Sequence, residues 1–273
     1  MMINETFFTL YNNVKIPKLG LGTFQTVDGS EKIAVKEALA CGYRHIDTAK
    51  AYENEKGIGE AIKESQIPRE EIFLVSKVKN SDQGYHSTLN AFDETMNNLD
   101  SSYLDLYLIH WPKKISNETW EAMEKIYNSG KVRAIGVSNF KTHHLEDLLS
   151  TAKIKPMVNQ VEFHLKLQQN NLLTYCQSNH IQLEAYAPLM RGEVLNIDLL
   201  KELSLKYNKT SAQVALRFII QKDIIVIPKS SKPHRIKENG NIFDFELSTE
   251  DMDKLTTLNE NKRFYSDPDD KYS

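Results

Sequence analysis

The segment IFLVSKVKNSDQGYHSTLNAFDETMNNLDSSYLDLYLIH, residues 72–110, contains the repeating unit on which the whole fold is built. Its two short apolar runs, Ile72–Val78 and Leu104–Ile109, predict buried strands. Between them, Ser87–Leu99 predicts a helix. A strand, a helix and a second strand in this order form a βαβ unit, in which the strands run parallel and the crossover is right-handed.

The same alternation continues on both sides of this segment. Further strands are predicted at Leu19–Gly22, His45–Asp47, Val132–Val137, Met157–Val161, Gln182–Tyr186 and Ile224–Ile227. Further helices are predicted at Ser30–Ala40, Glu53–Ser65, Asn117–Ser129, Thr142–Ser150, Asn170–Asn179, Leu199–Tyr207, Ser211–Gln221 and Pro233–Asn241. A hairpin of Thr6–Leu10 and Val14–Ile16 precedes them. Eight strand–helix pairs over about 250 residues predict an α/β fold of the (β/α)8 TIM barrel type, because an open doubly wound sheet fits this repetition less well.

Composition and charge limit the classes of protein that this chain can belong to. Hydrophobic residues make up 40% of the sequence and charged residues 26%, with a net charge of -3. We therefore expect no nucleic-acid partner and no anionic membrane surface. The N-terminus lacks the pattern of a signal peptide, and no apolar run is long enough to span a membrane. Two cysteines favour a reducing cytoplasm, although a bridge between Cys41 and Cys176 stays open.

No linker or low-complexity segment divides the chain, so residues 1–273 are predicted to form a single domain with an N-terminal hairpin and a short C-terminal tail. In such barrels the reactive groups lie at the C-terminal ends of the strands. Polar side chains end or follow nearly every predicted strand: Asp47, Lys77, His110, Ser138, Asn139, Gln160, Glu162, Tyr186, Lys229 and Ser230. This regularity predicts a binding or catalytic site rather than a packing pattern.

Three of these groups, together with Tyr52, suggest a proton-donating site. Tyr52 lies five residues after Asp47, in the loop above the strand ends. We expect Lys77 to lower the pKa of Tyr52 and Asp47 to keep Lys77 charged, while His110 orients a substrate oxygen. Each residue also has an ordinary interpretation: a structural Lys–Asp ion pair, a surface or capping tyrosine, a buried barrel histidine. Their joint position on adjacent strand ends favours catalysis.

The loop IPKSSKPHRIKEN, Ile227–Asn239, is the predicted phosphate site. It follows a strand and opens a helix, whose N-terminus favours anions. Lys229, Arg235 and the Ser230 hydroxyl suggest the extra phosphate of NADPH, although a solvated basic turn has the same composition. No GxGxxG occurs, which disfavours a Rossmann site.

These motifs together resemble those of the aldo-keto reductases, over almost the whole chain. GYRHIDTAKAYENEKGIG (Gly42–Gly59), VRAIGVSNF (Val132–Phe140) and IPKSSKPHRIKEN carry the resemblance, with VSKV, LIHWP, NQVEFH and EAYAPL between them in the family order. The trimmed loops are similar to those of bacterial members. The resemblance implies a reductase that transfers a hydride from NADPH to small, polar or dicarbonyl aldehydes and ketones.

The resemblance also implies roles for individual residues. The catalytic tetrad corresponds to Asp47, Tyr52, Lys77 and His110. The residues implied to bind the cofactor are Gly22, Thr23, Asp47, Ser138, Asn139, Gln160, Tyr186, Leu189, Lys229, Ser230, Arg235, Glu238 and Asn239. Among these, Ser138, Asn139 and Gln160 correspond to the nicotinamide carboxamide site. The residues implied to contact the substrate are Phe24, Tyr52, Lys79, His110 and Trp111.

Lys79 departs from the family, in which this position is commonly aromatic. Residues 77 and 79 lie on one side of a strand, so we expect Lys79 to face the pocket mouth and favour anionic or strongly polar carbonyl compounds, unless it turns to solvent or pairs with Asp82. The short tail RFYSDPDDKYS, residues 263–273, predicts an open pocket and broad specificity. We expect a monomer.

Three other functions are open to such a chain. One is a nucleotide-binding regulatory subunit with little turnover. Another is a Schiff-base aldolase with Lys77 as its nucleophile, which a charged Lys77 disfavours. Metal catalysis is the third, and we expect no metal because the histidines lack HExxH or paired-ligand spacing.

Overall fold

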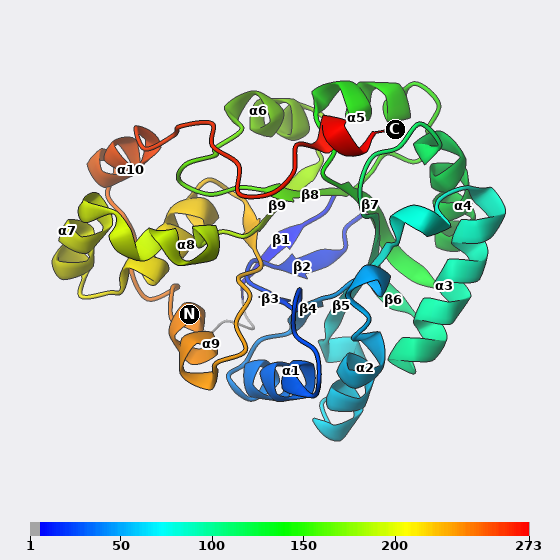
Figure 1. The fold of residues 1–273 in the computed structure, drawn as a ribbon, viewed down its shortest axis with the longest axis horizontal. Helices are drawn as coiled ribbons and strands as arrows, with labels where there is room; N and C mark the ends of the chain where they lie inside the picture. Colours follow the sequence, from blue (N-terminus) through cyan, green and yellow to red (C-terminus); the bar gives the residue numbers. More distant parts are fainter. Residues whose placement is uncertain (1–5, 273) are drawn as a thin grey trace.

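The computed structural model describes residues 6–272, in which eight parallel strands form one sheet. Neighbouring strands follow the order of the chain, with right-handed crossovers through the helices outside (Figure 1). The strands are β3 (Leu21–Gly22), β4 (His45–Asp47), β5 (Phe73–Val78), β6 (Leu104–Ile109), β7 (Val132–Ser138), β8 (Val158–Glu162), β9 (Gln182–Tyr186) and β10 (Ile225–Val226).

Contacts between the first and last strands close this sheet into a ring. Leu19 pairs with Val226 and Gly22 with Lys229, both in parallel, and the Gly20 N–H donates to the Val226 carbonyl at 2.9 Å. A side chain at Gly20 would lie 2.7 Å from the ring of His45, so this close approach requires glycine. The predicted (β/α)8 barrel is confirmed.

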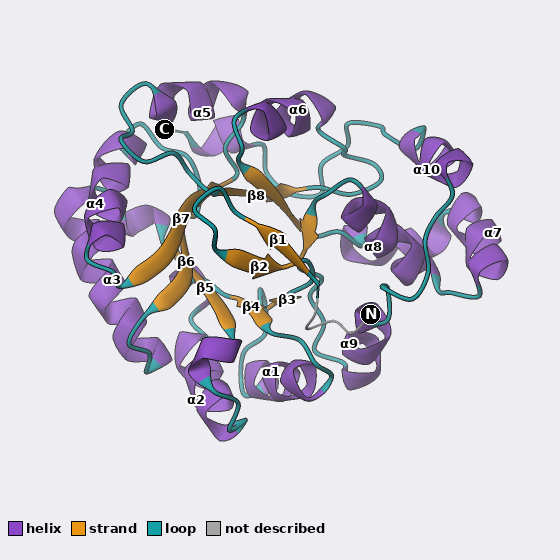
Figure 2. Cartoon of the chain, turned by 180° about the vertical axis from the view of Figure 1, so that it is seen from behind, coloured by secondary structure: helices purple, strands orange, loops and turns teal. Residues whose placement is uncertain are grey.

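Helices surround the barrel on its outside (Figures 1 and 2). They are α1 (Ser30–Ala40), α2 (Glu55–Glu64), α3 (Tyr85–Leu99), α4 (Ser116–Asn128), α5 (Thr142–Leu149), α6 (Asn170–Ser178), α7 (Asp198–Tyr207), α8 (Ser211–Gln221), α9 (Pro233–Gly240) and α10 (Thr249–Thr256). The sequence analysis missed α10, although Ser248 caps it by accepting a hydrogen bond from the Asp251 N–H. None of the helices among residues 6–272 has the length and apolar character needed to cross a membrane.

The predicted hairpin consists of β1 (Phe7–Thr9) and β2 (Lys15–Pro17) and crosses the barrel axis in Figure 2. Its Leu10 and Ile16 pack against Phe73 and Val158, which begin their strands. The hairpin therefore covers the N-terminal end of the barrel. The C-terminal ends of the strands, where the polar residues lie, stay free of it.

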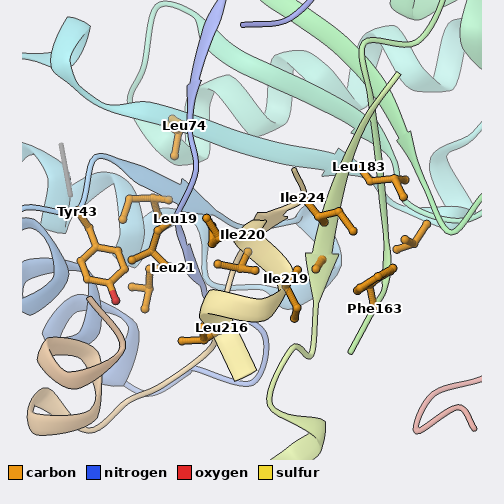
Figure 3. Close-up of a cluster of buried hydrophobic side chains, with 14 of the residues drawn as sticks. Leu19, Leu21, Tyr43, Leu74, Phe163, Leu183, Leu216, Ile219, Ile220 and Ile224 are labelled. Atoms are coloured by element: carbon orange, nitrogen blue, oxygen red, sulfur yellow. The ribbon is translucent and has the colours of Figure 1, made fainter. Parts of the chain in front are cut away.

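Alternation along the strands explains which side chains enter the barrel. On β5, Leu74 and Val78 point outward and belong to the large apolar cluster between the strands and the outer helices. Figure 3 shows part of this cluster, including Leu74 and, farther along, Ile219 and Ile220 of α8. Val75 points inward with the core under the hairpin. Lys77 shares the parity of Val75, so its side chain enters the barrel at the end of the strand.

Candidate active site

A buried ion pair lies at the centre of the site. The Lys77 ammonium donates to both carboxylate oxygens of Asp47, at 2.7 and 2.8 Å, and to the Thr48 carbonyl at 2.8 Å. Lys77 and Asp47 are almost completely buried. Three acceptors satisfy the three donors of the ammonium, so this buried ion has no unsatisfied donor. Lys77 does not line the cavity and its ammonium is paired with Asp47, so it is poorly placed to form a Schiff base with a substrate.

Tyr52 lies directly above this pair. It ends the short helix η2 (Lys50–Tyr52), and the Lys77 ammonium is 5.1 Å from the centre of its ring. The rings of Tyr52 and His110 meet edge to face, with centroids 5.5 Å apart. The arrangement brings a phenol and an imidazole to one point on the cavity wall.

The expected direction of the Tyr52 pKa shift was wrong. Burial raises the pKa of Tyr52 well above its usual value, and the Asp47 carboxylate adds to the shift. The ammonium of Lys77 does not reverse this because Asp47 and Thr48 already take its three hydrogen bonds. Tyr52 therefore keeps its proton at neutral pH, which is the state that a proton donor requires.

His110 follows β6 and is neutral at physiological pH. Burial, followed by the charge of Lys77, lowers the pKa of His110 to about 3. A neutral imidazole offers one N–H donor, so His110 can donate one hydrogen bond to an oxygen in the cavity.

A second group of polar side chains is joined by hydrogen bonds beside the tetrad. The Asn139 amide donates to the His110 carbonyl at 2.9 Å, and the Tyr186 hydroxyl donates to Asn139 Oδ1 at 2.8 Å. Gln160 Nε2 donates to Asp47 Oδ2 at 2.8 Å. The groups predicted to hold a carboxamide thus share a network with the groups predicted to transfer a proton.

A cavity of about 840 Å³ joins this network to the start of α9. Most predicted site residues line it: Gly22, Phe24, Asp47, Tyr52, His110, Trp111, Ser138, Asn139, Gln160, Tyr186, Leu189, Lys229, Ser230, Arg235, Glu238 and Asn239. Thr23 is buried behind the wall, where its hydroxyl donates to the Asp47 carbonyl at 2.8 Å. An extended cavity of this size suits an elongated ligand.

The α9 end of the cavity offers positive charge. Neither Lys229 nor Arg235 forms an ion pair with any of residues 6–272. Pro233 begins α9, so the free N–H groups of its first turn add to the positive potential. Glu238 accepts from the Thr210 hydroxyl at 2.8 Å. Cations without a carboxylate partner at a helix start form a suitable place for a phosphate.

Lys79 does not occupy its predicted place. β5 ends at Val78, so the strand does not extend far enough to aim residue 79 at the pocket. The Lys79 ammonium lies 4.0 Å from Glu53, and its side chain is 42% exposed. Lys79 is not among the residues that line the cavity, so the structure does not support the predicted contact between Lys79 and the substrate.

The C-terminal tail supplies a wall that the sequence analysis missed. Tyr265 lines the cavity, with its ring 5.4 Å from Tyr186 and 6.4 Å from Phe24. The neighbouring Phe264 N–H donates to buried Glu162 at 2.6 Å, which fixes the tail beside the barrel. The short tail therefore narrows the pocket that we expected to be open.

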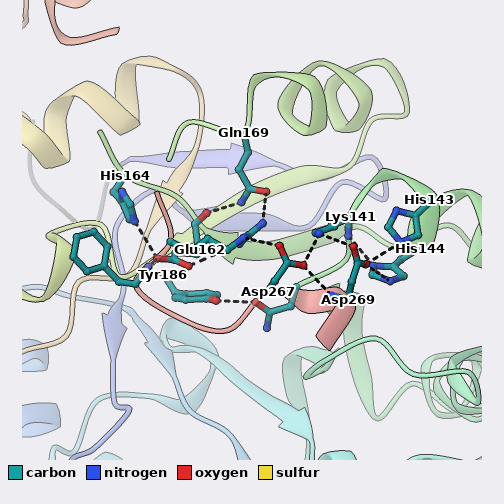
Figure 4. Close-up of polar contacts among 12 residues, drawn as sticks. Lys141, His143, His144, Glu162, His164, Gln169, Tyr186, Asp267 and Asp269 are labelled. Carbon is teal, nitrogen blue, oxygen red and sulfur yellow. Dashed lines mark hydrogen bonds and ion pairs between the residues drawn. The ribbon is translucent and has the colours of Figure 1, made fainter. Parts of the chain in front are cut away.

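Farther along, the tail is held by charged groups (Figure 4). Lys141 bonds Asp267 and Asp269, the latter at 2.6 Å, and His143 lies 3.0 Å from Asp269. His143, His144 and Asp269 are close enough together to suggest a metal site. The Lys141 ammonium already neutralises Asp269, and the Lys141 N–H donates to His144 Nδ1 at 3.1 Å. The proton of neutral His144 is therefore on Nε2, the atom that a metal would need, so the cluster acts as a clasp for the tail.

Comparison with known proteins identifies the family. The sequence model of the Aldo/keto reductase family matches residues 18–260. The chain belongs to this family. It is 54% identical over 263 residues to a glyoxal reductase of Bacillus subtilis, a match that covers 96% of this chain and 95% of that protein. It is 50% identical over 274 residues to the 9,11-endoperoxide prostaglandin H2 reductase of Trypanosoma cruzi, covering 98% and 97%.

Solved structures agree with this assignment. MGS-M4, an aldo-keto reductase from a deep-sea metagenome library, is 49% identical and superposes with a TM-score of 0.95, covering 96% of this chain and 98% of that one. A Bombyx mori aldo-keto reductase in complex with NADP is 33% identical with a TM-score of 0.92, covering 97% of both chains.

Proposed function

We propose that this aldo-keto reductase reduces small aldehydes and ketones to alcohols with NADPH, and that Tyr52 is the proton donor. The observation that carries the proposal is the position of Tyr52. It lies between the Lys77–Asp47 pair and His110, on a cavity that also presents Lys229 and Arg235, which have no ion-pair partner within residues 6–272. One relative is a glyoxal reductase, and one similar solved structure is a complex with NADP, and both support the same reaction.

The cavity has the donors and acceptors that NADPH needs. Lys229, Ser230 and Arg235 would hold the 2′-phosphate, and Glu238 and Asn239 the adenine. At the other end, Ser138, Asn139 and Gln160 would hold the carboxamide, with Tyr186 stacked on the nicotinamide. Gly22, Thr23, Asp47 and Leu189 complete the proposed binding residues. When bound, NADPH supplies the hydride that adds to the carbonyl carbon.

The remaining chemistry belongs to the tetrad. His110, being neutral, donates a hydrogen bond that orients the carbonyl oxygen towards Tyr52. As negative charge develops on that oxygen, the Tyr52 hydroxyl transfers its proton, because an alkoxide is a much stronger base than a phenolate. The Lys77 ammonium lies 5.1 Å from the ring and stabilises the phenolate that remains. Asp47 holds Lys77 in place throughout.

The walls of the cavity suggest the class of substrate. Phe24, Trp111 and Tyr265 surround the space above Tyr52 and His110. Aromatic walls beside a polar catalytic end fit small aldehydes, ketones and dicarbonyl compounds. The proposal extends to a single domain over residues 1–273 that acts as a monomer. Both cysteines of the chain are free, which supports a cytoplasmic location.

A panel of small carbonyl compounds tests this function. NADPH oxidation is followed by the loss of the near-ultraviolet absorbance of the reduced nicotinamide, with NADH in parallel. We expect turnover of small aldehydes and dicarbonyl compounds with NADPH and much weaker activity with NADH. Tight NADPH binding without turnover of any carbonyl compound would instead indicate the regulatory alternative.

A further inference from the structure

A buried carboxyl group below the tetrad has no part in the mechanism above. Glu184, on β9, points into the barrel and is completely buried. Its Oε1 accepts from Gln160 Nε2 at 2.6 Å. Its Oε2 lies 3.8 Å from Nε2 of His45, which is also completely buried. Neither of these two atoms has a hydrogen-bond partner within residues 6–272. Burying a carboxyl group costs free energy, so we expect Glu184 to have a function that offsets this cost.

The hydrogen bond from Gln160 to Glu184 determines which way the Gln160 amide faces. The two hydrogens of Gln160 Nε2 are both used, one by Asp47 Oδ2 and one by Glu184 Oε1. Since both partners accept, the nitrogen of the amide is held on the barrel side. The amide oxygen is left towards the cavity that Gln160 lines. A nicotinamide carboxamide has an NH2 group, which needs such an acceptor.

The charge of Glu184 is controlled by its surroundings. Burial, with the Asp47 carboxylate second, raises the pKa of Glu184 to about 8. Lys77 and Tyr52 are the other ionisable groups that act on this carboxyl from above. Burial lowers the pKa of His45 to about 4, so His45 stays neutral.

The proton of Glu184 has one consistent position. His45 Nδ1 is 3.4 Å from the Pro17 carbonyl, which can only accept, so Nδ1 carries the hydrogen of the neutral ring. Nε2 of His45 is then a free acceptor facing Glu184 Oε2. Because Oε1 of Glu184 accepts from Gln160, the proton belongs on Oε2, on the side of His45.

We propose that Glu184 is a positioning residue for the nicotinamide, which fixes the Gln160 amide with its oxygen towards the cofactor while remaining uncharged beside Asp47. The inference rests on the proposed contact between Gln160 and the carboxamide. A second consequence follows from the charge. The oxidised nicotinamide ring is a cation, so it favours the ionised form of Glu184. The affinity for NADP⁺ therefore rises as the pH rises through the pKa of Glu184, whereas the affinity for NADPH does not.

Two substitutions of one residue separate positioning from packing. Glu184→Leu removes the acceptor and lets the Gln160 amide rotate, so we expect the Kd of NADPH to rise about tenfold. Glu184→Gln keeps a carbonyl oxygen for Gln160, so its Kd should stay within about twofold of the wild type. The Kd values come from quenching of intrinsic fluorescence, with thermal melting as a check on folding. Equal Kd values for wild type and Glu184→Leu, or equal losses in both variants, would overturn the proposal.

The pH dependence gives a second test, which uses only the conservative variant. Between pH 7 and pH 9 the ratio of NADP⁺ affinity to NADPH affinity should rise about threefold in the wild type and stay constant in Glu184→Gln. The 2′-phosphate does not confuse the comparison, since a phosphate monoester titrates near pH 6, below this range. A constant ratio in the wild type, or the same rise in the variant, contradicts the assignment of the titrating group.

A third variant distinguishes this inference from the function on which it rests. Gln160→Leu removes the amide itself and should raise the Kd of NADPH at least as much as Glu184→Leu does. If Gln160→Leu binds NADPH normally, the carboxamide does not lie at Gln160 and the proposed cofactor placement fails. If Gln160→Leu weakens binding and Glu184→Leu does not, only the role of Glu184 is refuted.

Discussion

Two buried aspartates of the barrel, Asp47 and Asp105, are both paired with cations and differ in what surrounds the pair. Asp47 ends β4 and binds Lys77. Asp105 lies near the start of β6, where Arg69 and Arg133 bind its two oxygens at 2.9 and 2.7 Å. Both aspartates are almost completely buried.

The surroundings separate a catalytic pair from a structural one. The carboxylate of Asp105 also accepts from the Leu74 N–H at 3.0 Å, and its two arginines reach partly exposed positions. This pair joins neighbouring strands at the end of the barrel away from the cavity. The Asp47 pair instead has a protonated phenol above it and a cavity beyond. A buried ion pair alone therefore does not indicate an active site. The indication comes from an ionisable group, here Tyr52, that lies next to the pair and lines a cavity.

Breaking each pair gives the largest expected contrast. Lys77→Met should lower kcat by a factor on the order of 10³, because the phenolate of Tyr52 loses its stabilising charge. Asp105→Asn should leave kcat within about twofold of the wild type and lower the free energy of unfolding by about 2 kcal/mol. Steady-state kinetics and urea denaturation measure the two effects. Equal losses of kcat in both variants would mean that the two pairs act only through the fold.

Arg235 represents a third arrangement, a cation that pairs with no carboxylate among residues 6–272. Arg235→Ala should raise the Kd of NADPH at least about tenfold and leave that of NADH unchanged, because only NADPH carries the 2′-phosphate. Lys237→Ala, on the exposed side of the same helix, is the matched control and should affect neither. Titration of intrinsic fluorescence gives both Kd values. A similar loss of NADH affinity would place Arg235 away from the 2′-phosphate.

Tyr265 tests the wall that the tail adds to this site. Tyr265→Ala removes a ring from the cavity, so KM for a small aldehyde should rise about threefold with kcat nearly unchanged. Tyr272→Ala alters the same tail where it packs on His144 and leaves the cavity intact, which makes it the control. Kinetics at saturating NADPH decide the matter. A larger change of KM in Tyr272→Ala would show that the clasp, and not the ring, matters.

The smallest expected effect is a flat pH profile below neutrality. The pKa of His110, lowered to about 3, means that the imidazole stays neutral as the pH falls from 7 to 5. At saturating NADPH, kcat/KM for the aldehyde should therefore change less than about twofold over this range. A fall with a midpoint near pH 6 that disappears in His110→Gln would show that His110 titrates in the active enzyme.

The regular part of the molecule could be predicted from its sequence. The periodic segment at residues 72–110 and its repeats led to the barrel, and the strand ends led to Asp47, Lys77 and His110. These residues follow from local rules, since each lies where a short apolar run ends. The helix α9 and its cations could also be predicted, because an apolar strand is followed by Pro233 and several basic residues.

Long-range contacts account for what the sequence analysis missed. Tyr265 reaches the cavity because Phe264 binds Glu162, 102 residues earlier, and no periodic pattern marks that contact. Lys79 was misplaced because the end of β5 depends on its neighbours, not on its own residues. The raised pKa of Tyr52 comes first from burial and then from the nearby Asp47 carboxylate, and both depend on the folded structure.

The most direct test of the central claim is the activity of Tyr52→Phe, measured together with its Kd for NADPH. The substitution removes one hydroxyl and keeps the ring that contacts His110 and Phe24. We predict that carbonyl reduction falls by at least about 10³-fold, since no other group can supply the proton as effectively, while the Kd for NADPH stays within about twofold of the wild type. Retained turnover in Tyr52→Phe would contradict the role of Tyr52 as the proton donor.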